Sequence, residues 1–323
     1  PDGRSIAINV IDGKTAARKE RDERYGELEL HDEDPILSHL HVVDVATKQT
    51  RRLTQGAFAV GRYSWSPDSS EIAFDHRINR DLGNDFDADI SVVKVADGTV
   101  RPLVTQPGLD ATPMWSPDGK EIAFTTTGGN AAGYYYSVYG IAIVSAAGGK
   151  PRMLSTKIVD SPIFTGWTAD GIFAWSFERT WAYFYKVDPA TGATTVLRPA
   201  AEWAGTGFSL SRDSKSVAFV AADANTYSEV YVAPVSTMQG KRITDLGAQI
   251  AGWPKITREA VSWKSVDGTM VEGVLHRPPD YKPGEKRPLL VVIHGGPASA
   301  SRAVQYGNAS PTYPIEVWVN KGA

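Results

Sequence analysis

The chain has 323 residues, of which 42% are hydrophobic and 22% charged, as in ordinary soluble proteins of one large domain or two smaller ones. Its net charge of −3, with no cluster of Lys or Arg, argues against nucleic acid or an acidic membrane as a partner. Because Cys is absent, disulfides and cysteine nucleophiles are excluded, and no apolar run approaches the roughly 20 residues of a membrane helix.

A short motif recurs along most of the chain. The two strongest copies are Ser-Trp-Ser-Pro-Asp-Ser at 64–69 and Met-Trp-Ser-Pro-Asp-Gly at 114–119, each followed by Glu-Ile-Ala-Phe. Weaker copies lie at 166–171 and 210–214, and residues 1–8 read as a copy that lacks its front. Proline fixes φ, aspartate offers a side-chain acceptor, and the next residue takes a positive φ. The motif therefore predicts a tight turn between two strands.

Each turn is followed by further short strands, and four short strands every 40 to 50 residues or so are typical of a propeller blade. We therefore predict a mainly β fold in which residues 1–250 form about five four-stranded blades of a partial β-propeller. A β-sandwich with accidental repeats is the alternative. The charged stretch 14–34 lacks β-alternation and is expected to be a helical or irregular insertion with a solvated surface.

Because the first copy starts inside its own motif, we expect the true N-terminus to be missing. The absence of a signal peptide is then uninformative, and the compartment stays open between cytoplasm and periplasm or secretion.

Other polar patterns suggest no cofactor and no metal site. The run Asp-Phe-Asp-Ala-Asp at 85–89 resembles the start of a calcium loop but lacks its glycine and distal glutamate, which favours a solvated loop. His39 and His41 share a strand face without an obvious third ligand, so packing is the simpler interpretation. Glycines at 128–133 lack the Lys of a phosphate loop.

A different organisation follows the last blade. Residues 261–275 predict a hairpin around an Asp-Gly turn, and a proline-rich loop comes after it. We assign residues 251–323 to a second domain. Within it, the apolar run 288–293 predicts a short buried strand that leads directly into His-Gly-Gly-Pro.

A strand that ends in a glycine turn is where α/β-hydrolases aim backbone N–H groups at a developing oxyanion. On this interpretation Gly295 and Gly296 supply N–H donors, and His294 shapes the turn. The alternative is a simple tight turn after a buried strand.

The ordered combination resembles the prolyl oligopeptidase family of serine peptidases, near its acylaminoacyl-peptidase and dipeptidyl-peptidase-like members. It consists of Trp-Ser-Pro-Asp blades, Trp-Lys-Ser-Val-Asp-Gly-Thr at 263–269, and the strand into His-Gly-Gly-Pro. The resemblance implies about seven or eight blades capping an α/β-hydrolase domain that hydrolyses short peptides. No Gly-x-Ser-x-Gly elbow occurs here, so the Ser, Asp and His of the triad are expected after residue 323. The chain would then be an internal fragment, inactive alone.

Dipeptide-trimming members of that family hold the peptide amino terminus with propeller carboxylates, but their local motif is not found here. Glu178 and Arg179, in the aromatic stretch 175–185, are the candidates left for substrate binding, and surface pairing is the other interpretation. Short peptides are the expected partners, and homo-oligomerisation stays open. The alternative function is a non-catalytic propeller that binds proteins and carries a vestigial hydrolase segment.

Overall fold

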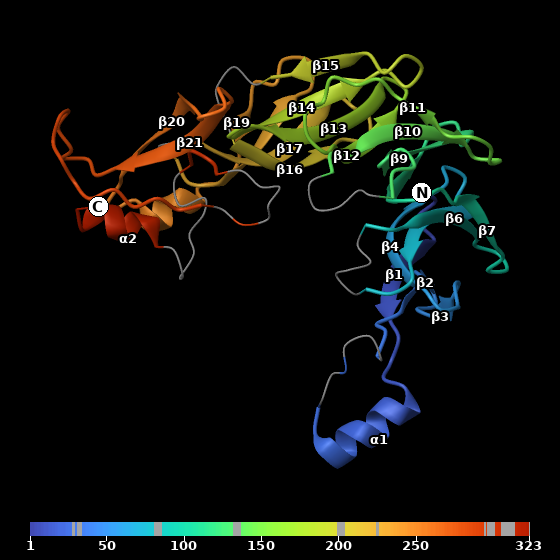
Figure 1. Cartoon of the computed structure of the whole chain (residues 1–323). Coiled ribbons are helices and arrows are strands. Elements are labelled where there is room, and N and C mark those ends of the chain that lie inside the picture. The colour runs from blue at the N-terminus through green and yellow to red at the C-terminus, as the bar shows by residue number, and fades with distance from the viewer. Residues whose placement is uncertain are drawn as a thin grey trace. The chain divides into compact units, whose positions relative to one another are not determined.

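The computed structural model describes residues 1–27, 30, 34–80, 86–131, 137–198, 204–223, 226–293, 295, 301–304 and 314–322. It is mainly β and divides into two compact units (Figure 1). The first unit contains Pro1–Thr156, Trp167–Ala169 and Pro189–Gly192; the second contains Lys157–Gly166, Asp170–Asp188 and Ala193–Ala323. The predicted domain boundary at residue 250 stays a prediction.

The strands form successive sheets that follow the sequence repeats, and we number these sheets as blades. Blade 1 consists of β1 (Ser5–Ile11), β2 (Ser38–Asp44) and β3 (Thr50–Arg52). Blade 2 consists of β4 (Ala59–Trp65), β5 (Glu71–Arg77), β6 (Asp89–Lys94) and β7 (Val100–Val104). Blade 3 consists of β8 (Asp110–Trp115), β9 (Glu121–Thr126), β10 (Gly140–Ser145) and β11 (Arg152–Met153).

Blades 4 and 5 lie in the second half of the chain, where most of blade 4 belongs to the second unit. Blade 4 consists of β12 (Ile163–Thr168), β13 (Gly171–Glu178), β14 (Trp181–Val187) and β15 (Thr194–Leu197). Blade 5 consists of β16 (Ala204–Leu210), β17 (Ser216–Ala222), β18 (Glu229–Pro234) and β19 (Lys241–Arg242). A 3-10 helix (Leu246–Ile250), the hairpin β20 (Thr257–Lys264) and β21 (Met270–Arg277), and helix α2 (Ile315–Asn320) follow.

Blades 3, 4 and 5 are each a four-stranded antiparallel sheet in which sequential strands are neighbours. Blades 1 and 2 join into one seven-stranded sheet, because Ser38 of β2 pairs in parallel with Ala59 of β4. The prediction of a mainly β fold built from propeller blades is confirmed.

The repeated turn has the hydrogen bonds that its sequence predicts. Ser66 Oγ donates to Asp68 Oδ1 at 2.6 Å, and the backbone N–H of Glu71 donates back to Ser66 Oγ at 2.9 Å. The same serine-to-aspartate bond, 2.7 Å long, recurs in two of the other four turns, at Ser116–Asp118 and Ser211–Asp213. In each of these three turns the serine hydroxyl is the first cause that holds the pKa of the aspartate below its ordinary value. Side-chain bonds therefore fix the register of these blades locally.

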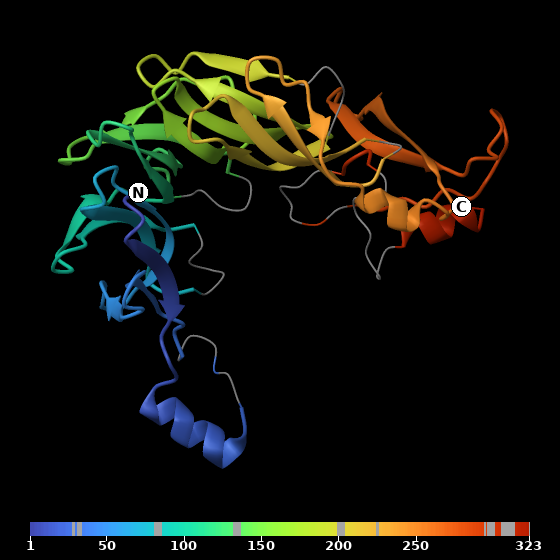
Figure 2. The same ribbon diagram turned by 180° about the vertical axis from the view of Figure 1, so that it is seen from behind.

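Helix α1 (Ala16–Tyr25) interrupts blade 1 between β1 and β2, as the charged stretch predicted. The Thr15 hydroxyl caps it by accepting from the N–H of Arg18 at 3.2 Å. No α1 residue is buried, and both views show the helix away from the strands of its own unit (Figures 1 and 2). Two of its charges pair with residues that flank the helix, Asp22 with Lys14 at 2.8 Å and Arg21 with Asp34.

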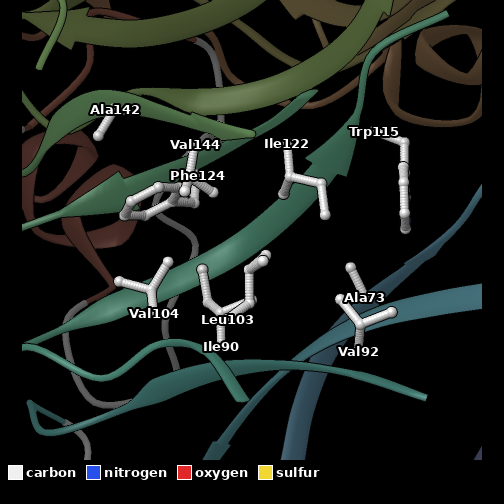
Figure 3. Close-up of a cluster of buried hydrophobic side chains, with 10 residues drawn as sticks. All are labelled: Ala73, Ile90, Val92, Leu103, Val104, Trp115, Ile122, Phe124, Ala142 and Val144. Atoms are coloured by element: carbon white, nitrogen blue, oxygen red, sulfur yellow. The ribbon is translucent and has the colours of Figure 1, made fainter. Parts of the chain in front are cut away.

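Apolar side chains from neighbouring blades pack together. Between blades 2 and 3, Figure 3 shows Phe124 on the side of Leu103 and Ile90, and Trp115 on the side of Ala73 and Val92, all in one buried cluster. At roughly 25 cal/mol per Å² of apolar surface removed from water, such interblade burial is the main source of stability. This packing requires side chains that alternate between the two faces of each strand, so that apolar ones face the neighbouring blade.

Blades 4 and 5 share a second core, in which aromatic rings stack. The ring centroids are 5.7 Å apart for Phe173 and Phe184, 5.0 Å for Phe184 and Phe208, and 5.3 Å for Phe208 and Phe219. These separations lie in the favourable range for aromatic pairs, so the stack links the two blades beyond simple burial.

The predicted hairpin over 261–275 is confirmed by β20 and β21 and their Asp-Gly turn, where Gly268 has a φ of 84°. The predicted buried strand at 288–293 is wrong: these residues have no regular secondary structure, and the side chains from Leu289 to Ile293 are 39% to 86% exposed. A strand needs a neighbour to pair its backbone groups. Among the described residues, β20 and β21 pair only with each other.

Candidate functional site

The tip of the β13–β14 hairpin is held by a side chain from β21. Thr180, in the two-residue turn, donates from its backbone N–H (3.2 Å) and its hydroxyl (2.8 Å) to Glu272 Oε1. Arg179 precedes it in the turn with a φ of 58°, a conformation that favours glycine. Its Nη1 lies 3.8 Å from Glu272 Oε2, and its side chain is 69% exposed. Glu272 therefore anchors the turn while Arg179 stays accessible.

A hollow of about 710 Å³ opens beside this tip, entirely within the second unit, and we call it the polar hollow. Blade 4 supplies one side of it and the β20–β21 hairpin another. The residues that line it are Glu178, Arg179, Trp181, Tyr183, Arg198, Arg258, Glu259, Ala260, Glu272 and Ala303.

Most charges of the polar hollow are compensated by protein groups. Arg258 has a fully buried side chain, and its Nη2 lies 2.7 Å from Glu316 Oε1 of α2. Glu259 pairs with Arg277 on the facing strand. Glu272 accepts two hydrogen bonds from Thr180 in the blade 4 turn. The charges on this side of the polar hollow therefore already have protein partners.

Glu178 and Arg198 are different. The Arg198 guanidinium lies over the Tyr183 ring, 4.4 Å from its centroid, which is a cation–π contact. Within the described part of the chain, neither Glu178 nor Arg198 forms a hydrogen bond or an ion pair. The polar hollow thus presents one uncompensated anion and one uncompensated cation.

Tyr185 lies close enough to both charges to feel their electrostatic effect. It is two residues from Tyr183 on β14 and therefore shares its face, with the ring centroids 6.5 Å apart. The residue is 1% exposed, and burial, followed by Glu178 and Tyr183, raises the pKa of its phenol to about 12. Its hydroxyl has no hydrogen-bond partner among the described residues. Tyr185 is a neutral donor that lacks a protein acceptor.

His276 stands opposite Arg258 in the β20–β21 register. Burial, and then the Arg258 charge, lower the pKa of this imidazole from 6.5 to about 4. It is therefore uncharged near neutral pH and adds no cation to this side of the polar hollow.

The structure brings together part of what the sequence singled out. Glu178 and Arg179 both line the polar hollow, and their role in substrate binding stays a prediction. Gly295 is exposed, and a Cβ at its position would meet no atom within 4 Å. His294 and Gly296 lie outside the described residues, so the oxyanion loop stays a prediction too.

Sequence reasoning missed Arg198, Tyr185 and Glu272. The alternation of β14 could have placed Tyr185 on the face of Tyr183. Nothing in the sequence alone pairs Glu272 with a turn that lies 92 positions away.

The remaining candidates do not form a site in the described residues. His39 is buried, with Nδ1 3.2 Å from the Thr54 hydroxyl, which is a packing role. Asp85 lies outside the described residues, and the pKa of Asp89 is raised by burial and then by Asp87. No group of three or more His, Asp or Glu in the described ranges could hold a metal ion. The helices described there are too short and too polar to cross a bilayer.

Neither a protein-family model nor a curated protein matches this sequence. Solved structures do match it in fold. A candidate dipeptidyl aminopeptidase IV from Bacteroides ovatus has 12% identity and a TM-score of 0.61, covering 99% of this chain and 49% of that one. A puromycin-hydrolyzing peptidase from Mycobacterium tuberculosis has 16% identity and a TM-score of 0.53, covering 86% and 54%.

A puromycin hydrolase variant in a complex has 18% identity and a TM-score of 0.52, with 82% of this chain and 51% of that chain covered. The chain spans about half the length of these structures. At such low identities the likeness shows the fold alone: the chain shares the propeller-blade architecture of these peptidases.

Proposed function

We propose that this chain is the propeller and the beginning of the catalytic domain of a serine peptidase that hydrolyses short peptides. The observation that carries the proposal is the order of its parts. Five blades precede the hairpin β20–β21, and His-Gly-Gly-Pro follows; in four of the blades Trp-Ser-Pro-Asp or a weaker copy of it lies at the turn between the first two strands. The fold likeness to the B. ovatus protein supports it, because it extends over 99% of the chain and so past residue 250.

In the proposed mechanism a serine attacks the scissile carbonyl while a histidine accepts its proton and an aspartate orients that histidine. The same histidine then protonates the leaving amine, and water hydrolyses the acyl-enzyme. The triad would follow residue 323. Backbone N–H groups of Gly295 and Gly296 would stabilise the oxyanion, and His294 would shape their turn. Removing a single oxyanion donor typically costs about 100- to 1,000-fold in rate.

The blades over 1–250 would act as the cap that limits entry to short peptides, and 251–323 would begin the α/β-hydrolase domain. Glu178 and Arg179 would face the peptide from the cap side. The activity is proposed as acylaminoacyl- or dipeptidyl-peptidase-like.

The first experiment reads the gene past the codon for Ala323. We expect Gly-x-Ser-x-Gly, then Asp, then His, and we expect the whole product to react with a fluorophosphonate probe and to release p-nitroaniline from peptide anilides. Replacing the elbow serine by alanine is the matched control and should abolish both signals. A whole protein without an elbow, unreactive to the probe, would replace this proposal by the protein-binding propeller.

Residues 1–323 alone should not turn over the same anilides, because the nucleophile would be absent. Hydrolysis by this segment, purified separately from the whole protein, would place the catalytic group within it.

A further inference from the structure

The polar hollow contains two charges that the fold does not use. Every other acid and arginine that lines it has a protein partner, whereas Glu178 and Arg198 have no ionic partner in the described residues. Glu178 is half-buried and Arg198 is exposed, so the shielded Glu178 gains the most from a partner of opposite sign. An anion and a cation on one surface therefore suit a ligand that carries both signs.

Strand geometry sets the separation of the two charges. Glu178 ends β13, and Arg198 directly follows β15, with β14 between them. Two strand spacings amount to about 10 Å. Glu178 faces Trp181 whereas Leu197, just before Arg198, faces Phe184, so an offset of about two residues along the strands brings the Cα separation to about 12 Å. Three extended residues span about 10 to 11 Å, so a tripeptide is comparable in length with the separation of these two residues.

The surroundings of Arg198 suit a carboxylate. Tyr183 supports one face of the guanidinium, and the N–H fork has no acceptor among the described residues. Such a fork binds a carboxylate through two parallel hydrogen bonds. Tyr185, which shares the β14 face of Tyr183, is 1% exposed and does not line the polar hollow, so it supports this surface from within rather than contacting the carboxylate.

The φ of 58° at Arg179 is also seen at turn residues elsewhere, such as Ser69 at 64° and Ser214 at 59°, so it reflects the tight turn and is not evidence for a site. Arg179 lines the polar hollow. Its exposed guanidinium, 3.8 Å from Glu272, adds positive charge at the rim of the polar hollow.

We infer that the polar hollow binds a short peptide with both ends unblocked, its carboxylate at Arg198 and its amino group at Glu178. This inference rests on the proposed function and narrows its substrate class to free short peptides rather than N-acylated ones. Tyr183 and Trp181 line the space between the two charged ends.

The test measures binding without catalysis. Calorimetric titration of the 1–323 chain with tri-alanine is compared with N-acetyl-tri-alanine and with tri-alanine amide. We expect each blocked peptide to bind roughly tenfold more weakly, as expected when one charged hydrogen-bonding partner is lost.

Variants assign each end of the peptide. Arg198→Met keeps the packing on Tyr183 and should bind tri-alanine and its amide equally, while still discriminating against the acetylated peptide. Glu178→Gln should bind tri-alanine and N-acetyl-tri-alanine equally, while still discriminating against tri-alanine amide. Arg212→Met, at an exposed position in the blade 5 turn away from the polar hollow, is the matched control and should bind like the parent chain.

Equal binding of blocked and unblocked peptides by the parent chain would overturn the inference. So would undiminished discrimination in Arg198→Met and Glu178→Gln, or no binding of tri-alanine at about 10 mM, a concentration at which even millimolar affinity is detected. If Arg198→Met fails to fold by circular dichroism, Arg198→Lys keeps the charge but loses the fork, and should lose most of the discrimination between carboxylate and amide.

Different results would contradict the serine-peptidase proposal and the peptide-binding inference. An inactive whole protein whose chain still discriminates peptide ends would end the peptidase proposal and leave this site standing. An active peptidase without this discrimination would do the opposite.

Discussion

Blade 4 has two faces built from alternate residues of the same strands. On one face Phe173, Trp175 and Phe184 pack against the aromatic rings of blade 5. On the other, Tyr183 and Tyr185 lie near Glu178 and Arg198, which form no hydrogen bond or ion pair in the described part of the chain. The apolar face accounts for the stability of this region. The polar face contains the charges of Glu178 and Arg198, which the stability of the fold does not require. We expect a ligand to bind at these charges.

The largest expected effect on stability comes from a substitution that disrupts packing on the apolar face of blade 4. Phe184→Ala removes a side chain that is 1% exposed and stacks on both Phe173 and Phe208. We expect a loss of about 3–5 kcal/mol in the free energy of unfolding, measured by urea denaturation. Val196→Ala, on β15 and 44% exposed, is the control and should cost less than about 1 kcal/mol. Similar costs would mean that the aromatic stack is not the main support of blade 4.

A smaller effect is expected where β21 holds the tip of the blade. Glu272→Ala leaves the N–H and the hydroxyl of Thr180 without an acceptor at a residue that is 3% exposed. The expected loss is about 1–3 kcal/mol by thermal or urea unfolding. Glu272→Gln keeps an acceptor oxygen and should lose less. Equal losses for the two variants would assign the effect to charge rather than to hydrogen bonding.

A stabilising change is expected at the strained turn. Arg179→Gly relieves a φ of 58° and should raise the free energy of unfolding by up to about 1 kcal/mol, despite the greater entropy of unfolded glycine. Ser214→Gly, at a φ of 59° in the blade 5 turn, is the matched control and should change stability similarly. Destabilisation by Arg179→Gly alone would show that the contact with Glu272 outweighs the strain.

The smallest effect on stability is expected from a substitution on the polar face of blade 4. Tyr185→Phe removes a buried hydroxyl without a partner, so stability should stay within about 0.5 kcal/mol or rise slightly. Tyr63→Phe removes a hydroxyl that donates to the Ala7 carbonyl at 3.0 Å and should cost about 1 kcal/mol. A clear loss at Tyr185, measured by the same urea titration, would reveal an acceptor for its hydroxyl.

The blades could be predicted from the sequence because their determinants are local. The hydrogen bonds of Ser66, Asp68 and Glu71 join residues at most five positions apart, and strand alternation then decides which side chains face a neighbouring blade. Each repeat therefore contains most of the information for its own sheet.

The polar hollow could not be assembled in this way. It depends on Glu272 reaching the turn at Thr180, and on Arg198 stacking against Tyr183 after β15. The strand predicted at 288–293 failed for a related reason. An apolar run has the same sequence whether or not a neighbouring strand pairs with it, so its pairing cannot be predicted from its own residues.

The repeated turn also bears on how the chain folds during synthesis. Since the serine hydroxyl of each turn bonds to groups just ahead of it in the sequence, and the strands of each blade pair in order, one blade can form before the next has left the ribosome. The contacts between blades, such as the aromatic stack between blades 4 and 5 and the apolar core between blades 2 and 3, must wait for both partners. Ribosome-stalled chains should therefore gain protease resistance in steps that follow the blades.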